Sequence, residues 1–394
     1  MSWEYKTLDQ LGEVSRGRSK HRPRNDSSLF GGEFPFIQTA DVKAANFYIT
    51  QYDTTYNEKG LAQSKLWHPG TLCITIAANI ADTGILAMDA CFPDSVMGFI
   101  PYEGIADVRF VKYCFDILQQ NCKKISQGAA QDNLSWEKLS TILFPAPPID
   151  IQVKMADTLS AYDDLIENNQ KQIKLLEEAA QRLYKEWFVD LRFPGHETTL
   201  ITDGIPEGWS QGVLGDVVVE SGRKISKDNR EGYSYYLPID CLPKKSLGYI
   251  TTNEIALAES SLVAFAPRDI IFGAMRPYFH KVVVARDSGI TRTTCFVLNT
   301  GNPAYWAYAV MLMFSSDTVD YATQISVGTT MPYTRWKDFK SMPIIVPSEE
   351  CAIAFGKEID PIITKINGLA KQIVLLQQAR DRLLPKLMNG EIEV

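Results

Sequence analysis

The chain has 394 residues, of which 45% are hydrophobic and 22% are charged. These are ordinary globular values, so a disordered or fibrous protein is excluded, and the length suffices for two or three domains. The net charge of −7 argues only weakly against nucleic-acid binding, because the charge of the facing surface decides that interaction.

The ends and the cysteines indicate the compartment. Residues 1–6 lack the basic and apolar regions of a signal peptide, and the apolar stretch 305–314 is too short to span a bilayer. We therefore expect a soluble, cytoplasmic protein. The seven cysteines are scattered without a CxxC pair, which argues against both a disulfide framework and a zinc site, so we interpret them as small buried residues.

The first predicted domain, residues 1–150, mixes α and β elements, with a strand-like run at 71–76. Five basic residues and no acid lie between residues 15 and 25. Arginine and lysine contact phosphates and guanine, while asparagine and glutamine pair with adenine edges. For any single residue a solvated surface role remains the alternative, but not for the basic cluster. The candidate DNA contacts of this domain are Arg16, Arg18, Lys20, Arg22, Arg24, Gln38, Asn79, Gln127, Gln131 and Asn133.

Residues 151–190 follow as a predicted spacer helix. Apolar residues recur there at alternating steps of four and three, which is typical of a coiled-coil seam. One seam position is polar, and it either fixes the helix register or marks a locally wet seam. The predicted seam residues are Met155, Leu159, Tyr162, Ile166, Asn169, Ile173, Leu176, Ala180, Leu183 and Trp187.

A polar linker with proline and glycine, residues 192–208, leads to a second mixed α/β domain at 206–348, with a strand-like run at 281–285. Its basic and aromatic residues again suit DNA contacts in loops. The candidates are Arg223, Lys224, Lys227, Arg230, Lys244, Lys245, Arg276, Tyr278, His280, Arg292 and Tyr333.

Residues 349–390 form the second predicted spacer helix. Asp360 and Pro361 suit a helix cap and first helical position, so we expect a kink or restart there. The predicted seam residues are Phe355, Ile359, Ile362, Ile366, Leu369, Ile373, Leu376, Arg380, Leu383 and Leu387.

The chain repeats itself at an offset of 200 residues. Residues 125–128 resemble 325–328, Trp136 matches Trp336, and residues 171–183 are closely repeated at 371–383. A repeat of this length indicates a duplicated domain with its connector rather than a solenoid. The two seams most simply pair with each other in antiparallel fashion about a pseudo-twofold axis; the alternative is that each helix packs on its own domain.

Motifs of catalysis are missing. Gly356-Lys357 lacks the spacing of a P-loop, and no GxGxxG or HExxH is present. We therefore assign neither catalytic residues nor metal ligands, and we expect a non-catalytic chain.

Several segments resemble the DNA-specificity subunits of type I restriction–modification enzymes. Residues 127–152, with Gln127-Gly128 and Pro147-Pro148, are similar to the end of a target-recognition domain running into that family's spacer helix. Residues 183–191 are similar to its mid-chain segment, and residues 379–392 to its C-terminal ending. The resemblance covers nearly the whole chain. One departure is Met331-Pro332-Tyr333 where the first copy has Gln131-Asp132-Asn133, which fits two domains that read different half-sites.

The resemblance implies an α+β fold with two target-recognition domains separated by two long antiparallel helices. It implies binding of double-stranded DNA with a bipartite site, two methyltransferase subunits and restriction–translocase subunits. No cofactor is expected in this chain, whereas the partners would use S-adenosylmethionine, ATP and Mg²⁺ and would methylate adenine. The main alternative is a stand-alone bipartite DNA-binding regulator; an enzyme fused to a reader and a purely structural coiled coil explain the sequence less well.

Overall fold

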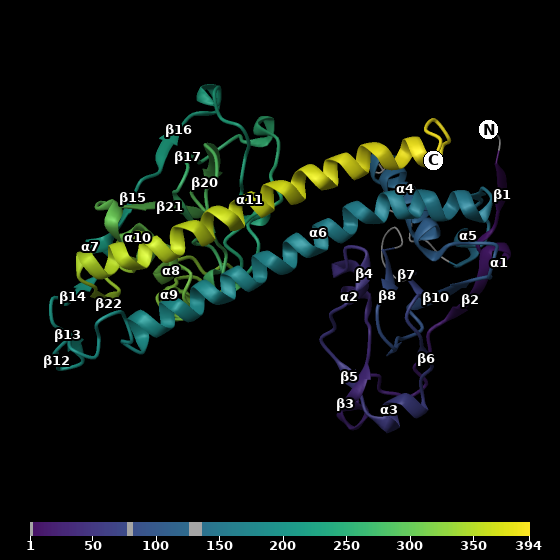
Figure 1. The fold of residues 1–394 in the computed structure, drawn as a ribbon, viewed down its shortest axis with the longest axis horizontal. Helices are drawn as coiled ribbons and strands as arrows, with labels where there is room; N and C mark the ends of the chain where they lie inside the picture. The colour runs from purple at the N-terminus through teal and green to yellow at the C-terminus, as the bar shows by residue number, and fades with distance from the viewer. Residues whose placement is uncertain (1–2, 77–81, 126–135) are drawn as a thin grey trace. The chain divides into compact units, whose positions relative to one another are not determined.

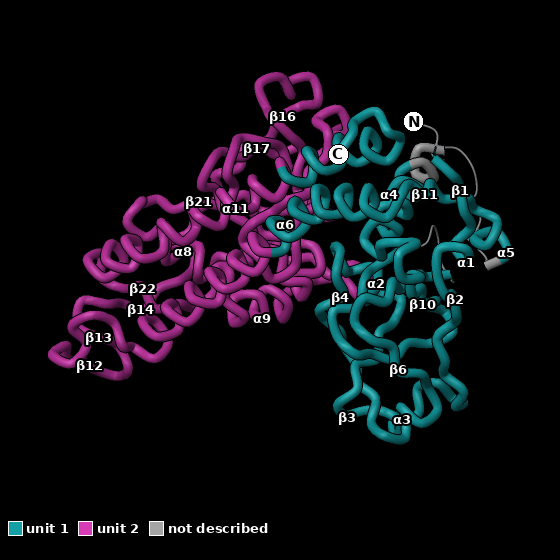
Figure 2. Tube along the Cα trace, turned by 45° about the vertical axis from the view of Figure 1, so that its right-hand side comes forward, with its two compact units in different colours: residues 1–167, 376–394 teal, residues 168–375 magenta. Residues whose placement is uncertain are grey.

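The computed structural model describes residues 3–76, 82–125 and 136–394. The chain divides into two units, residues 1–167 with 376–394 and residues 168–375 (Figure 2). Both ends of the chain belong to the first unit, and the second unit lies between them in sequence. The hydrophobic core of the first unit joins N-terminal residues to Leu384, Leu387 and Met388.

Two long helices, α6 (Ile149–Tyr184) and α11 (Glu349–Met388), each contribute to both units (Figure 1). A π-helical turn, Lys185–Val189, follows α6. Within each unit the two helices run antiparallel: Asp163 meets Arg380 in the first unit, and Asn169 donates a 3.3 Å hydrogen bond to Gln372 in the second. The predicted pairing of the two spacer helices is confirmed.

The seam follows the predicted positions with two shifts in α11, one of which buries Leu384 rather than Leu383. Ile359 and Ile366 are fully buried, but between them Ile363 rather than Ile362 is buried. The expected restart at Pro361 is wrong, because α11 continues through it without a break. Proline removes only one helical hydrogen bond, and a long helix packed on a partner tolerates that loss. Asn169 is itself buried, so the seam is not open to solvent at this polar position.

The first unit contains a five-stranded sheet and a two-stranded ribbon. The ribbon pairs β1 (Glu4–Lys6) with β11 (Phe144–Ala146). All sheet pairings are antiparallel except the parallel pairing of β4 with β8. The sheet order is β2 (Gly12–Arg16), β10 (Val96–Pro101), β7 (Leu72–Thr75), β8 (Thr83–Leu86) and β4 (Tyr48–Ile49).

Smaller elements complete this unit. Two short strand pairs, β3–β5 and β6–β9, and the helix α3 form its far end from α6 (Figure 1). The bounds are α1 (Leu8–Leu11), β3 (Phe30–Pro35), α2 (Thr39–Ala44), β5 (Thr55–Tyr56), α3 (Glu58–Ala62), β6 (Leu66–Trp67), β9 (Ala90–Cys91), α4 (Val108–Ile125) and α5 (Trp136–Leu139).

The second unit repeats the same plan. A ribbon again pairs an early strand, β14 (Ser210–Val213), with the strand before the long helix, β22 (Pro343–Val346). The four-stranded sheet has the same order of equivalent strands and lacks only a counterpart of β4. That order is β15 (Val218–Glu220), β21 (Cys295–Thr300), β18 (Ile270–Gly273) and β19 (Val282–Val284). The internal repeat inferred from the sequence is therefore present in the fold.

The two copies differ in their smaller elements. The single helix α4 of the first copy is replaced by two helices, α8 and α9, and a three-stranded sheet β16–β17–β20 replaces the short strand pairs. The linker carries a hairpin of β12 and β13. The bounds are β12 (Ile201–Thr202), β13 (Ile205–Pro206), α7 (Leu214–Val217), β16 (Arg223–Ile225), β17 (Leu262–Phe265), β20 (Gly289–Arg292), α8 (Trp306–Met313), α9 (Ser316–Gln324) and α10 (Trp336–Phe339).

Two general expectations can be compared with the structure. Five cysteines are buried and Cys241 is half-buried, while the side chain of Cys122 lies outside the described residues. In the described part of the chain, none of the helices combines the length and apolar character that crossing a membrane requires.

Candidate nucleic-acid interface

The basic segment of the first unit follows β2 and is held by its backbone. Gly17 and Arg18 donate hydrogen bonds to the carbonyls of Val96 and Phe92, at 2.9 and 3.0 Å. A Cβ atom at Gly17 would overlap the carbonyl oxygen of Pro93, so only glycine permits this approach. The Ser64 hydroxyl, beyond α3, donates to the Arg18 carbonyl at 2.7 Å. The segment is therefore a fixed loop from which side chains project.

The structure brings acids to this segment that the sequence places far away. Arg24 binds both carboxylate oxygens of Asp94 at 2.7 Å, and His21 contacts Asp26 at 2.7 Å. Hydrogen bonds from Ser28 and His21 lower the pKa of Asp26 to about 2, so its carboxylate is ionised at neutral pH. The expectation of five basic residues free of acids is thus corrected, because folding pairs Arg24 with an acid 70 positions later.

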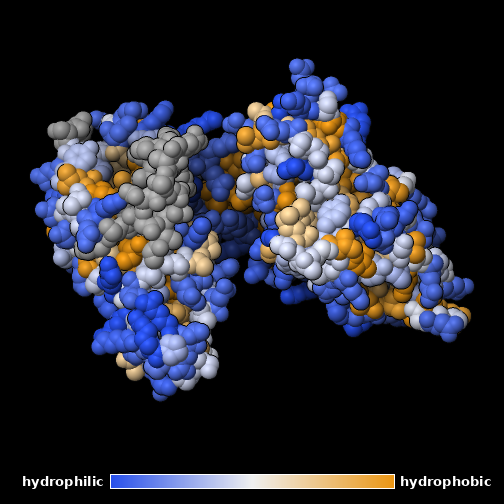
Figure 3. Space-filling view, turned by 180° about the vertical axis from the view of Figure 1, so that it is seen from behind, coloured by the Kyte–Doolittle hydropathy of each residue, from blue (hydrophilic) through white to orange (hydrophobic). Residues whose placement is uncertain are grey.

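Three cations of the segment remain available. Arg16, Arg18 and Lys20 are exposed, and no acidic partner is seen for them in residues 3–76, 82–125 and 136–394. Arg22 is exposed as well but donates to the carbonyls of Ser19 and His21, at 2.7 and 2.8 Å. Hydrophilic side chains gather over the lower end of the first unit, the end that carries β3, β5 and α3 (Figure 1 and Figure 3). Such a surface suits phosphate contacts.

A pocket of about 430 Å³ adjoins the segment and unites two predicted residues, Arg24 and Gln38. Gln38 donates a 2.9 Å hydrogen bond to the Thr54 hydroxyl, which orients its amide. The aromatic side chains Phe30 and Phe36 form the apolar part. Sequence reasoning missed them, because hydrophobic residues in a strand predict core rather than a pocket wall. The pocket is lined by Ser19, Arg24, Asn25, Phe30, Phe36, Gln38, Thr39, Thr54, Pro93 and Ser95. The other candidates of this domain, Asn79, Gln127, Gln131 and Asn133, lie outside the described residues.

In the second unit, two loops distant in sequence meet. The connector 274–281, between β18 and β19, contains Arg276 and Tyr278, and the hairpin 327–333 contains Tyr333. The Arg276 N–H donates to the Pro332 carbonyl at 2.7 Å, and the Thr334 N–H donates to the Ala274 carbonyl at 2.9 Å. The Tyr333 hydroxyl reaches the Thr293 carbonyl at 3.4 Å, directly after Arg292. The segments that carry Arg276, Arg292 and Tyr333 therefore lie side by side, and Tyr278 is two residues further along the connector.

The small sheet β16–β17–β20 carries further predicted cations. In the sheet register Ile225, Leu262 and Arg292 are neighbours across three strands, so Arg292 lies near the strand that bears Arg223 and Lys224. Arg223 donates to the Tyr233 hydroxyl at 2.9 Å. Lys224 and Lys227 are exposed. Lys244 and Lys245 are also exposed, with the Lys244 ammonium 4.5 Å from the centre of the Phe279 ring.

Two predicted contacts have structural roles instead. The Arg230 guanidinium donates to the carbonyls of Lys227, Ile255, Ala256 and Ala258 at 2.6–3.2 Å, which holds two loops together. His280 is buried, with Nε2 2.9 Å from the Phe314 carbonyl, and burial lowers its pKa. Neither side chain is free to face a ligand, so both are left out of the interface.

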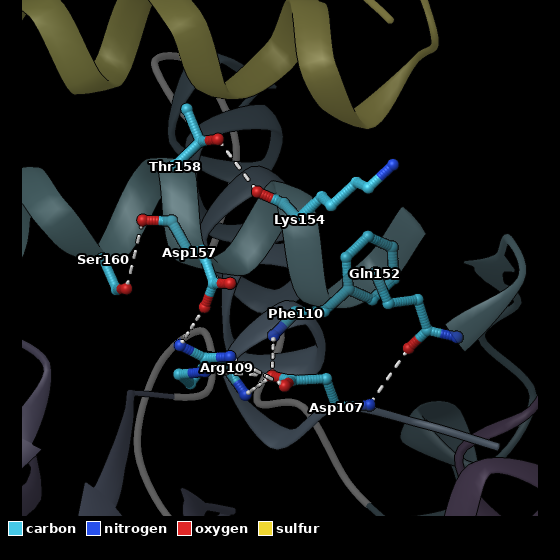
Figure 4. Close-up of polar contacts among 8 residues, drawn as sticks. All are labelled: Asp107, Arg109, Phe110, Gln152, Lys154, Asp157, Thr158 and Ser160. Atoms are coloured by element: carbon cyan, nitrogen blue, oxygen red, sulfur yellow. Dashed lines mark hydrogen bonds and ion pairs between the residues drawn. The ribbon is translucent and has the colours of Figure 1, made fainter. Parts of the chain in front are cut away.

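The first domain is fixed to α6 by a buried amide and an ion pair (Figure 4). The buried Gln152 side chain accepts from the Asp107 N–H at 3.1 Å and donates to the carbonyls of Ile105 and Pro147, both at 2.9 Å. Arg109, which also binds Asp107, donates to Asp157 at 2.8 Å. The loop 105–109 at the start of α4 is therefore held in place on the helix.

The outer faces of the long helices carry a repeated pattern. The side chains of Leu175 and Leu375 are 64% and 56% exposed, although no core packing requires leucine there. On α6, Leu175 is followed by exposed Ala179 and Arg182. On α11, the same three residue types are exposed 200 positions later. Steps of four and then three residues place the members of each set on one face of their helix. Trp187, Phe188 and Leu384 are buried in the chain's own cores, so they do not belong to this exposed pattern.

Comparison with known proteins finds relatives that match over nearly the whole chain. Residues 1–178 match the family model described as the type I restriction modification DNA specificity domain. The chain is 28% identical to the type I restriction enzyme MjaIX specificity subunit of Methanocaldococcus jannaschii, over 100% of this chain and 94% of the relative. It is 21% identical to the HindI specificity subunit of Haemophilus influenzae, over 97% and 98%. The fold matches the crystal structure of a type I restriction–modification S subunit from M. genitalium with a TM-score of 0.59 at 16% identity, over 98% and 96%.

Proposed function

We propose that this chain, which belongs to the family of type I restriction–modification specificity subunits, recognises a bipartite DNA target and positions methyltransferase and restriction subunits on it. Each α/β head would read one half of the target. The helices α6 and α11, which are shared by both units, would serve as the spacer. Equivalent major-groove sites on one face of a duplex recur about every 34–36 Å, which a long helix pair can bridge.

The observation that carries this proposal is a duplicated fold with unlike loops. Both heads have the same ribbon and the same order of equivalent sheet strands, but their smaller sheets and helices differ. A shared scaffold suits the same mechanical role twice, whereas different loops suit two different base sequences, because bases are read by individual side chains. Arg16, Arg18 and Lys20 are exposed and meet no acid among the described residues, which supports phosphate contacts in the first head.

The repeated outer faces support docking of two copies of one partner. Leu175 with Arg182 and Leu375 with Arg382 offer the same exposed combination twice. An exposed leucine beside an arginine fits a partner with an apolar socket and nearby carboxylates. We assign these two faces to the two methyltransferase subunits.

The chemistry would belong to the partners. A methyltransferase must extract the adenine from the base stack before methylating it, so a separate reader that fixes the enzyme over the duplex is physically reasonable. In this proposal the methyltransferase subunits hold S-adenosylmethionine and the restriction subunits use ATP and Mg²⁺. This chain contributes recognition and placement.

Charge insertion into one face at a time tests the docking. The chain is co-purified with its methyltransferase partner, and the number of partners per chain is measured by native mass spectrometry. Leu175→Glu and Leu375→Glu should each reduce two partners to one, and the double variant should bind none. Leu165→Glu is the matched control, because Leu165 is equally exposed at 51% but has Lys365 at the repeated position. Two partners retained by both single variants would refute the assignment.

A further inference from the structure

Three non-glycine residues in or directly beside the connector 274–281 of the second head have left-handed backbone. Arg276 has φ of 50°, His280 of 52° and Lys245 of 53°. This conformation is unfavourable for an L-residue and persists only where the surroundings impose it. The Lys245 N–H donates to the His280 carbonyl at 2.8 Å, so the strained positions support one another.

Backbone contacts fix the point from which the Arg276 side chain extends. Its backbone N–H is bound to the Pro332 carbonyl, which locks the connector 274–281 to the hairpin 327–333. The two flanking residues are constrained as well, since Met275 pairs with Tyr333 and Pro277 is buried. A rigid base of this kind preorganises a long side chain for a directional contact.

The guanidinium of Arg276 is poorly satisfied. Its Nε atom is enclosed without a hydrogen-bond partner in the described part of the chain, and Nη2 makes only a long, 3.4 Å bond to the Thr330 carbonyl. A buried donor without a partner is destabilising and calls for an explanation. Within the described residues the terminal nitrogens make no hydrogen bond shorter than this one, so they can still bind a better acceptor.

The other arginines of this head are already engaged. Arg268 binds Asp360, Arg335 binds Asp338, and Arg286 contacts Asp287, in each case through a carboxylate. Arg223 and Arg292 interact with the hydroxyls of Tyr233 and Tyr236. Arg230 is bound by four carbonyls. Arg276 thus combines a rigid backbone with a guanidinium that still needs an acceptor.

From this combination we infer that Arg276 is a base-reading residue of the second head and recognises a guanine in its half-site. The inference rests on the proposed DNA-binding function. The guanine O6 and N7 atoms accept two parallel N–H bonds in the major groove, which the terminal nitrogens of arginine match. Tyr278 on the same connector and Val327 and Met331 on the paired hairpin are 50%, 45% and 58% exposed, and they add apolar surface that suits thymine methyl contacts.

Base substitution across the second half-site tests this role. The complex of this chain with its methyltransferase partner is assayed for binding to duplexes in which each position of the target is changed in turn. The variant Arg276→Asn is preferred to Arg276→Ala because asparagine tolerates left-handed backbone. We expect it to abolish the preference for guanine at one position, which amounts to a loss of about 5- to 150-fold in discrimination. Arg276→Lys, which keeps the charge but not the paired donors, should lose most of it as well.

Lys224→Ala is the matched control, because Lys224 is an exposed cation of the same head. It should weaken binding to all sequences equally, as a phosphate contact does. The base preferences of the other half-site report whether each variant is folded. If Arg276→Asn weakens binding to all sequences equally and the guanine preference remains, the inference is wrong although the proposed function stands. If the wild-type complex shows no bipartite preference, the proposed function itself fails.

Discussion

The Leu247 N–H donates a 2.7 Å hydrogen bond to the carboxylate of Glu177 on α6. The Ser246 hydroxyl donates to the same oxygen at 2.7 Å. The next residue, Gly248, packs on α11, where a Cβ atom would lie 2.9 Å from the Ile366 side chain. One loop of the second head therefore contacts both long helices of its unit, and this fixes the orientation of the head on them.

Glu177 gives a pH dependence of known sign. Burial raises the pKa of Glu177 above its ordinary value of 4.5, because the charged form loses hydration. Its contribution to stability is therefore fully present below pH 4.5 and is lost as the pH rises through the folded-state pKa. Glu177→Gln keeps an acceptor for Ser246 and Leu247 but carries no charge. We expect its thermal midpoint to equal that of the wild type near pH 4 and to match or exceed it at pH 8.

Glu178→Gln is the control for this experiment, since the Glu178 side chain is 43% exposed and lies 4.0 Å from the Arg182 guanidinium. It should show no such pH-dependent gain. A Glu177→Gln protein that is less stable than the wild type at pH 8 would contradict the account.

The ion pair in the helix seam predicts a non-additive pair of substitutions. Asp163 is buried, accepts a 2.6 Å hydrogen bond from the Tyr113 hydroxyl and pairs with Arg380. Arg380→Leu leaves a buried carboxylate without its cation, which costs about 3 kcal/mol. The double variant Asp163→Leu with Arg380→Leu should be more stable than Arg380→Leu alone. Thermal and urea unfolding of the wild type, the two single variants and the double variant measures the coupling.

Arg382→Leu is the matched control because Arg382 is exposed on the same helix. We expect a change within about 0.5 kcal/mol. Equal costs for Arg380→Leu and Arg382→Leu would show that the seam pair does not hold the helices.

The basic segment predicts a change in salt dependence. Each phosphate contact contributes about 0.9 to the slope of log K against log salt. Replacing Arg16, Arg18 and Lys20 by alanine should therefore flatten the slope by up to about 2.7. Arg24→Ala should change the slope much less, because Asp94 already neutralises Arg24. Filter binding or fluorescence anisotropy over a range of salt concentrations measures the slope for each variant. A slope change for Arg24→Ala as large as that for Arg16→Ala would contradict this assignment.

The division of labour predicts that this chain alone transfers no methyl group. With labelled S-adenosylmethionine and target DNA, the purified chain should show background incorporation. Addition of the methyltransferase partner should give both incorporation and tight sequence-specific binding. Incorporation by the chain alone would overturn the proposal that it acts only in recognition and placement.

Much of this fold could be predicted because the informative patterns are local or repeated. The seam spacing indicated both long helices, and the 200-residue offset predicted that equivalent elements would recur: α5 begins at Trp136 and α10 at Trp336. The seam alone could not show that α11 passes through Pro361 without a break, because packing along a long helix overrides a local breaker.

The site was less predictable because its properties depend on distant contacts. The segment 16–24 contains no acid, yet Asp94 neutralises Arg24 once the turn at 93–96 is placed. The sequence marks His280 and Arg276 alike as polar loop residues, although one is buried and the other is half-exposed.

The most direct test of the whole account is a genome-wide map of methylated adenines in a strain with and without this gene. The account predicts a gene-dependent motif in two specific parts separated by a fixed number of unspecified bases, with one methylated adenine in each part. A continuous motif, or methylation that does not change when the gene is removed, would contradict it.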